Sequence, residues 1–161
     1  MKGWLARLFA ASVPAVDLAG PKDARAIAQL HAASFHRGWS ESEVEQMLTE
    51  RNTLAQALRF RRKLIGFVIS RLAADEAEIL TIALASAFRG RGFSRTLLGI
   101  HLGHLAGRGI ARVFLEVEEN NEAAVRLYCG AGFRTVGRRE QYYRSADGRH
   151  LNALVMQRDL S

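Results

Sequence analysis

The feature that most constrains the fold is a long helix between two apolar strands in the middle of the chain. The segment "AEILTIALA" (residues 77–85) predicts a strand apolar enough to lie at the centre of a sheet. A helix is expected from 92 to 108, where "GRG" ends it with glycine, and "ARVFLEVE" (111–118) predicts the next strand. A strand, a crossover helix and a second strand form a right-handed βαβ unit, so part of the sheet must be parallel.

The flanking segments complete a mixed pattern of strands and helices. Two helices are expected near the N-terminus: one starts at Pro21, and the other starts at Ser40, where Glu43 completes a capping box. The other segments with strand patterns are 13–19, 53–60, 63–72, 133–144 and 151–160, and a helix is expected within 120–132. The order β-α-α-β-β-β-α-β-α-β-β predicts an α/β fold with a mixed sheet in a single domain, residues 13–161.

Composition excludes several classes of protein. With 161 residues and 48% hydrophobic residues, the chain suits one soluble globular domain. One cysteine, Cys129, permits no internal disulfide and fits a cytoplasmic location.

No stretch approaches the ~20 uncharged apolar residues of a membrane span. Residues 1–12 are treated as an N-terminal extension, expected as a short helix packed on the domain, with a membrane-surface helix as the alternative.

The net charge of +7 gives the surface an attraction for phosphates. Only three of the 23 basic residues are lysines, a skew toward arginine that genome composition alone produces, and no low-complexity basic tail is present. We therefore expect no direct nucleic-acid partner, and a basic RNA-binding protein stays the third of the functions considered.

The stretch "AFRGRGFSR" (87–95) lies between the central strand and the long helix. Gly90 and Gly92 permit positive φ angles, and the first turn of a helix offers free N–H groups with a partial positive charge. Together they form a nest for an anion such as phosphate, to which Arg89, Arg91 and Arg95 add charge. The pattern is neither a Rossmann fingerprint nor a P-loop. A plain turn with solvated arginines is the alternative.

Two motifs resemble those of the GNAT N-acetyltransferases. The first is Arg89-x-x-Gly92-x-Ser94, in which serine stands where that family usually carries glycine or alanine. The second follows a strand and comprises Asn121, Ala124, Leu127, Tyr128, Gly132 and Phe133. The resemblance spans roughly residues 14–160 and implies the GNAT fold, a mixed sheet of about six to seven strands flanked by about four helices. It also implies acetyl-CoA as the acetyl donor.

The resemblance assigns the donor site to the central strand, the glycine–arginine loop and the following helix. Backbone groups of the strand would hold the pantetheine arm, the loop amides would hold the diphosphate, and Asn121 would either contact the donor or only cap its own helix. The implied donor-binding residues are Ile82, Ala83, Leu84, Arg89, Gly90, Arg91, Gly92, Phe93, Ser94, Arg95 and Asn121.

Two residues are candidates for the chemistry of acetyl transfer. Strand alternation places Phe114, Glu116 and Glu118 on one face of "VFLEVE". The resemblance places a catalytic glutamate at Glu116, acting directly or through a water, with a surface carboxylate as the alternative. Tyr128 is the candidate acid for the leaving thiolate, and a core tyrosine is the alternative. Covalent catalysis through Cys129 is not expected.

The acceptor is less constrained than the donor. A narrower similarity, to the RimI-type ribosomal-protein-alanine acetyltransferases, lies in "LEVEENN", "RREQYYRSADGR" and "FHRGWSESEVEQ". It implies a protein N-terminus as acceptor. Tyr142 and Tyr143 alternate across a strand and Trp39 follows a helix, so all three are candidates to line the acceptor groove, with a core anchor as the alternative for Trp39. We expect a monomer or weak dimer. After "DGR", however, Asn152 stands about where such proteins carry Asp. A small-molecule amine, a lysine side chain and a non-catalytic CoA- or ribosome-binding module stay open as alternatives.

No metal site is expected from the sequence. His101 and His104 are spaced i, i+3, but no third ligand and no HExxH motif accompany them. We expect His31 and His36 to make local polar contacts.

Overall fold

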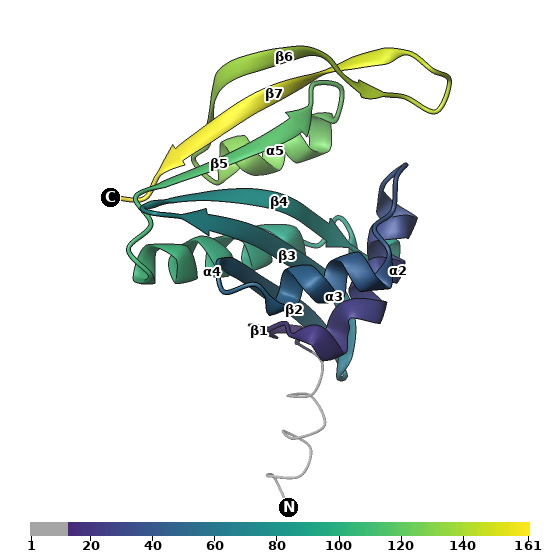
Figure 1. Cartoon of the computed structure of the whole chain (residues 1–161), viewed down its shortest axis with the longest axis vertical. Coiled ribbons are helices and arrows are strands. Elements are labelled where there is room, and N and C mark those ends of the chain that lie inside the picture. The colour runs from purple at the N-terminus through teal and green to yellow at the C-terminus, as the bar shows by residue number, and fades with distance from the viewer. Residues whose placement is uncertain (1–12) are drawn as a thin grey trace, which may run out of the picture.

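The structure, a computed structural model, describes residues 13–161 except for the side chains of residues 141–144. A seven-stranded sheet runs through the centre in the order β1-β2-β3-β4-β5-β7-β6, and four α-helices cover its two faces (Figure 1). The predictions of a packed N-terminal helix or a membrane-surface helix fall on residues 1–12, outside the described part. Within the described part, no helix has the length and apolar character needed to cross a bilayer.

The predicted order of strands and helices is confirmed. The strands are β1 (Ala15–Leu18), β2 (Thr53–Phe60), β3 (Lys63–Ala73), β4 (Glu76–Leu84), β5 (Arg112–Glu118), β6 (Arg134–Arg144) and β7 (His150–Asp159). The α-helices are α2 (Ala24–Ser34), α3 (Glu41–Thr49), α4 (Phe93–Gly107) and α5 (Glu122–Gly130). Two short 3-10 helices, η2 (Pro21–Asp23) and η3 (Ser86–Phe88), precede α2 and α4.

The centre of the sheet is where its geometry departs from a regular ladder. β4 occupies the middle position, as its apolar sequence predicts, and pairs in parallel with β5 only from Glu76↔Arg112 to Ile79↔Leu115. An extra residue in β4, Leu80, makes a bulge against β3, because Ile79 and Thr81 pair with successive β3 residues. Beyond that point β4 and β5 diverge, which opens a gap between them (Figure 1).

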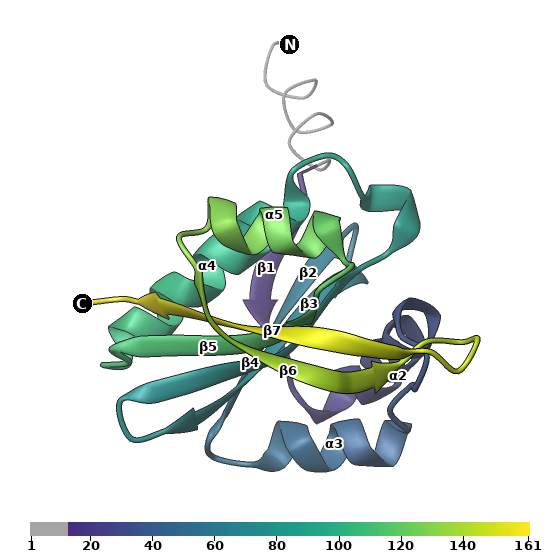
Figure 2. The same cartoon turned by 90° about the horizontal axis from the view of Figure 1, so that it is seen from above.

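The two faces of the sheet carry separate apolar cores. Helices α4 and α5 lie on one side and α2 and α3 on the other (Figure 2). The α4 side buries leucines such as Leu97 and Leu98 against Leu115 and Val117 of β5. The smaller core on the other side joins Ile27 and Val44 to Phe67, and none of the described helices covers the β5 end of that face.

The start of α3 follows the capping box that the sequence predicts. The Ser40 hydroxyl accepts a hydrogen bond from the Glu43 amide at 3.1 Å, and the Ser40 amide donates to the Glu43 carboxylate at 2.7 Å. The hydrogen bond from the Ser40 amide, followed by one from the Ser40 side chain, holds the pKa of the Glu43 carboxylate below its usual range. The two bonds of the capping box also fix the direction in which the chain enters α3 from Trp39.

A buried polar network joins α4 to the sheet. His101 is fully buried, and its Nδ1 lies 2.8 Å from Oε1 of Gln56 on β2, so this nitrogen donates. Its Nε2 accepts from the Ser70 hydroxyl on β3 at 2.6 Å. Burial lowers the pKa of His101 to about 3, which keeps the ring neutral. The network fixes the position of α4 over β2 and β3 because the three buried groups satisfy one another.

Candidate active site

The loop between β4 and α4 adopts the conformation that its glycines permit. Gly90 and Gly92 have φ angles of 76° and 81°, and Gly92 is the residue that precedes the first turn of α4. A Cβ at either position would meet no other atom within 4 Å, so the backbone angle, not space, calls for glycine. The loop therefore presents the first-turn N–H groups of α4 to an open surface.

A cavity of about 420 Å³ lies directly at this helix start. It is lined by Leu84, Gly90, Gly92, Phe93, Ser94, Arg95, Ala123, Arg126 and Leu127. Six of the residues predicted to bind the donor are thus brought together, and α5 supplies the opposite wall. Arg126 was not among the predicted residues, although it lies within the second motif, one residue before Leu127. Backbone amides, arginines and open space fit a diphosphate.

Arg89 and Arg91 take different positions within the loop. The Arg89 Nε donates to the Leu84 carbonyl at 3.0 Å and so ties the loop to the end of β4. The Arg91 guanidinium lies over the Phe88 ring, 5.9 Å from its centroid. Neither residue lines the cavity as Arg95 does.

The strand segment Ile82–Leu84 lies along the gap in the sheet. It pairs with Gly66–Val68 of β3, but the parallel pairing of β4 with β5 has already ended at Ile79. Its other edge thus faces the gap, where an extended chain could use it as a sheet edge.

Helix α5 carries two further predicted residues. Asn121 caps the helix, since its Oδ1 accepts from the Ala124 amide at 3.2 Å. Tyr128 is buried, with 7% of its surface exposed, and its ring meets Phe133 edge to face at 5.8 Å. Both residues belong to the α4 side of the sheet, where the first cavity lies.

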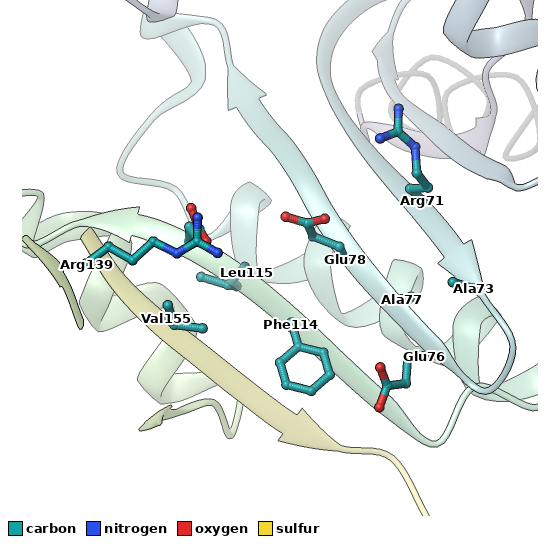
Figure 3. Close-up of a pocket in the computed structure, with 10 residues that line it drawn as sticks. Arg71, Ala73, Glu76, Ala77, Glu78, Phe114, Leu115, Arg139 and Val155 are labelled. Carbon is teal, nitrogen blue, oxygen red and sulfur yellow. The ribbon is translucent and has the colours of Figure 1, made fainter. Parts of the chain in front are cut away.

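Glu116 lies on the opposite face of β5, as the strand alternation predicts. Leu115 and Val117 are buried in the α4-side core, while the side chain of Glu116 is 16% exposed. It lines a second cavity of about 370 Å³ (Figure 3). The cavity is lined by Arg71, Ala73, Glu76, Ala77, Glu78, Phe114, Leu115, Glu116, Arg139 and Val155.

Arg139 is the residue lining this cavity that contacts Glu116 and that sequence reasoning missed. Its Nε lies 3.0 Å from Oε1 of Glu116, with the side chain 55% exposed. The arginine belongs to β6, which is separated from β5 by β7, so its side chain spans the width of β7 to reach the carboxylate. Arg139 and Val155 line the same cavity (Figure 3). No local sequence pattern predicts this contact, because the two residues are 23 positions apart. Their spacing does not indicate which strands are neighbours in the sheet.

The acidic residues after Glu116 form a separate surface cluster. Arg138 binds both carboxylate oxygens of Glu119, at 3.1 and 3.0 Å, and Asn152 donates to Glu119 at 3.1 Å. These bonds hold the pKa of Glu119 below its usual range. Asn152 thus connects β7 to the end of β5.

The predicted acceptor-side aromatics are placed only in part. Trp39 is half-buried; its ring stacks on His31 at 4.2 Å, and its amide donates to His31 Nδ1 at 3.2 Å. Burial lowers the pKa of His31, which keeps this nitrogen an acceptor. Tyr142 and Tyr143 belong to β6, but their side chains lie outside the described residues.

The candidate site therefore has two halves, one on each face of the divided sheet. The α4 half offers an anion nest, and the other half offers a carboxylate in a partly apolar cavity. Among the described residues, no three histidine, cysteine, aspartate or glutamate side chains are arranged so that they could hold a metal ion. The arrangement suits transfer between a phosphate-bearing donor on one face and a cationic or proton-bearing acceptor on the other.

Comparison with known proteins agrees with this geometry. Residues 24–133 match the model of the acetyltransferase (GNAT) family. A protein of Haemophilus influenzae named [ribosomal protein bS18]-alanine N-acetyltransferase is 32% identical over 81% of this chain and 95% of its own length. Its Escherichia coli K12 counterpart is 35% identical over 73% of this chain and 78% of its own.

Solved structures show the same fold. The ribosomal-protein-S18-alanine N-acetyltransferase of Escherichia coli superposes with a TM-score of 0.87 at 28% identity, covering 92% of this chain and 95% of that one. The Arabidopsis thaliana protein NAA60, solved with acetyl-CoA, superposes with a TM-score of 0.81 at 20% identity, covering 92% of this chain and 99% of that one. At this identity, the match shows a shared fold alone. The chain belongs to the acetyltransferase (GNAT) family and is an acetyl-CoA-dependent N-acetyltransferase.

Proposed function

We propose that this enzyme acetylates the α-amine at the N-terminus of a protein, with a ribosomal protein that begins with alanine as the model acceptor. The observation that carries the proposal is the similarity, over most of both chains, to two curated relatives named for that reaction. The open cavity at Glu116 supports it, because a chain terminus can reach the carboxylate from that face.

We place the donor on the α4 face. Bound acetyl-CoA supplies an acetyl thioester. The first-turn amides of α4 and Arg95 hold its diphosphate, and the free edge of Ile82–Leu84 aligns its arm with the gap in the sheet. The Leu84 amide is our candidate to stabilise the thioester oxygen as negative charge develops.

We assign the proton transfers to Glu116 and Tyr128. Glu116 takes a proton from the acceptor amine, directly or through a water, as the N–C bond forms. The C–S bond then breaks, and Tyr128 gives its phenolic proton to the leaving thiolate. Each residue later exchanges its proton with solvent, so both return to their starting state.

An α-amine is the easier acceptor for such a site. Its reference pKa is about 7.7–8.0, whereas that of a lysine side chain is about 10.4. The difference of roughly 2.5 units corresponds to ~3.5 kcal/mol of deprotonation, which the enzyme need not supply for a chain terminus.

The test is a thiol-release assay with the purified enzyme and acetyl-CoA. Acceptors are short peptides that differ in their first residue, the same peptides with a blocked N-terminus and an internal lysine, and polyamines. We expect turnover with free N-termini, best with alanine first, and at least about 100-fold less with the blocked lysine peptides, in line with the pKa difference. Turnover with polyamines alone would refute the proposed acceptor and leave the family assignment intact.

A further inference from the structure

We propose that Arg139 is a positioning residue that keeps the acceptor amine in its neutral, reactive form while the amine lies beside Glu116. The proposal rests on the proposed function, in that it takes the amine to approach Glu116 from the cavity of Figure 3. It gives a role to the ion pair between Arg139 and Glu116, which acetyl transfer does not in itself require.

The shortest contact of the ion pair involves one of the two carboxylate oxygens of Glu116. Arg139 approaches one carboxylate oxygen, Oε1, through its Nε at 3.0 Å. An amine that binds the other oxygen, Oε2, would then lie about 5 Å from the guanidinium, given ordinary hydrogen-bond lengths. Arg139 and the amine would therefore share one carboxylate, in a cavity that the apolar side chains of Phe114 and Val155 also line.

The charged residues that line the cavity with Glu116 come from three strands. β3 contributes Arg71, β4 contributes Glu76 and Glu78, and β6 contributes Arg139, while β7 contributes the apolar Val155. Glu118 follows on the same face of β5. Glu76 is bound to Arg112 at 3.0 Å, and Arg71 is the register partner of Glu78 across β3 and β4. Arg139 is the cation that contacts Glu116 itself.

The shared carboxylate lowers the affinity of the site for an ammonium ion. Beside a lone carboxylate, an ammonium is stabilised and holds its proton, which blocks attack on the thioester. A permanent guanidinium about 5 Å away repels the ammonium and favours the neutral amine. The released proton passes to Glu116 and then to solvent, and Arg139 takes no part in its transfer. Because Arg139 is half exposed, we expect an effect of about one pH unit.

The experiment is a pH profile of kcat at saturating acetyl-CoA and acceptor, since kcat reports ionisations of the bound complex. In Arg139→Gln the acidic limb should move up by about one pH unit, and below that limb the KM for the acceptor should fall. Arg139→Lys, which restores a cation, should return the limb toward its wild-type position. Arg139→Met provides the same comparison if Arg139→Gln does not fold.

The matched control is Arg138→Gln, which removes the neighbouring arginine of similar exposure and its bond to Glu119. It should leave the limb in place. A fall in kcat that is equal at every pH in Arg139→Gln, with an unmoved limb, would refute the proposal. If wild-type enzyme acetylates only small amines, the proposed acceptor is wrong, and the same profile with such an amine still tests Arg139.

Discussion

Glu116, our proposed base, has an environment that few surface carboxylates have. It is mostly buried, it faces a cavity, and its charge is matched by an arginine from two strands away. By contrast, Glu118, two residues along the same face, is not among the residues that line the cavity. The pair of glutamates therefore allows a matched test of the base.

We expect Glu116→Gln to lower kcat by about 10²- to 10³-fold, because the amide cannot accept the proton. The affinity for acetyl-CoA, measured by isothermal titration calorimetry, should not change, since the donor cavity lies on the other face. Glu118→Gln should keep wild-type kcat. Full activity in Glu116→Gln would show that the base is a different group.

The neutral state of His101 makes stability depend on pH. Its folded-state pKa is about 3, whereas an unfolded histidine has a pKa near 6.5. Between pH ~6.5 and pH ~3, His101 binds a proton in the unfolded chain but not in the folded protein. The free energy of unfolding therefore falls as the pH decreases through this range. At pH ~5 the contribution of His101 amounts to about 2 kcal/mol of lost stability relative to neutral pH.

Urea unfolding at neutral pH and at pH ~5 measures this loss. Replacing the whole network with apolar groups, in Gln56→Leu/Ser70→Ala/His101→Leu, should reduce the acid-induced loss by about 2 kcal/mol without leaving an unpaired partner. His104→Gln, which changes an exposed histidine of the same helix, should retain the wild-type loss. Equal losses in the triple variant and the wild type would contradict the assignment.

At the scale of elements, the two parts of α4 have different roles. Its first turn follows Gly92 and faces the cavity that we propose for the donor, while His101, two turns further along, fixes the helix to β2 and β3. The anion nest is thus anchored to the sheet, and its geometry depends on two left-handed glycines, of which Gly92 directly precedes the helix.

Gly92→Ala should weaken acetyl-CoA binding by about tenfold. An alanine at a φ of 81° is strained by roughly 1–2 kcal/mol, and the loop relieves this strain by leaving the conformation that exposes the amides. Gly99→Ala is the control, because Gly99 lies within α4, has open space around it and should gain up to about 1 kcal/mol of stability with unchanged affinity. Calorimetric titration of both variants would decide, and equal affinities would exclude Gly92 from the site.

At the scale of the whole molecule, the features that the sequence predicts are those that depend on residues close together in the chain. The capping box of Ser40 and Glu43, the alternation around Glu116 and the glycines of the loop need only local geometry, and all are found as expected. The order of the elements follows from the same local patterns.

The features that the sequence does not reveal depend on which strands become neighbours. β7 inserts between β5 and β6, and this alone brings Arg139 within reach of Glu116. The network of Gln56, Ser70 and His101 likewise joins three elements whose spacing carries no periodic signal. Such contacts are set by the packing of the entire chain, so they could be recognised only in three dimensions.

The short pairing between β4 and β5 also affects how the protein can vary. Only four register pairs join β4 to β5, between the part of the sheet that bears α2 and α3 and the part that bears the β6–β7 hairpin. We expect a small change in the angle between these two strands to change the width of the gap in which, on the proposed mechanism, donor and acceptor meet. Replacements along this short pairing, remote from every reacting atom, would therefore retune which acyl groups and which chain ends the enzyme admits.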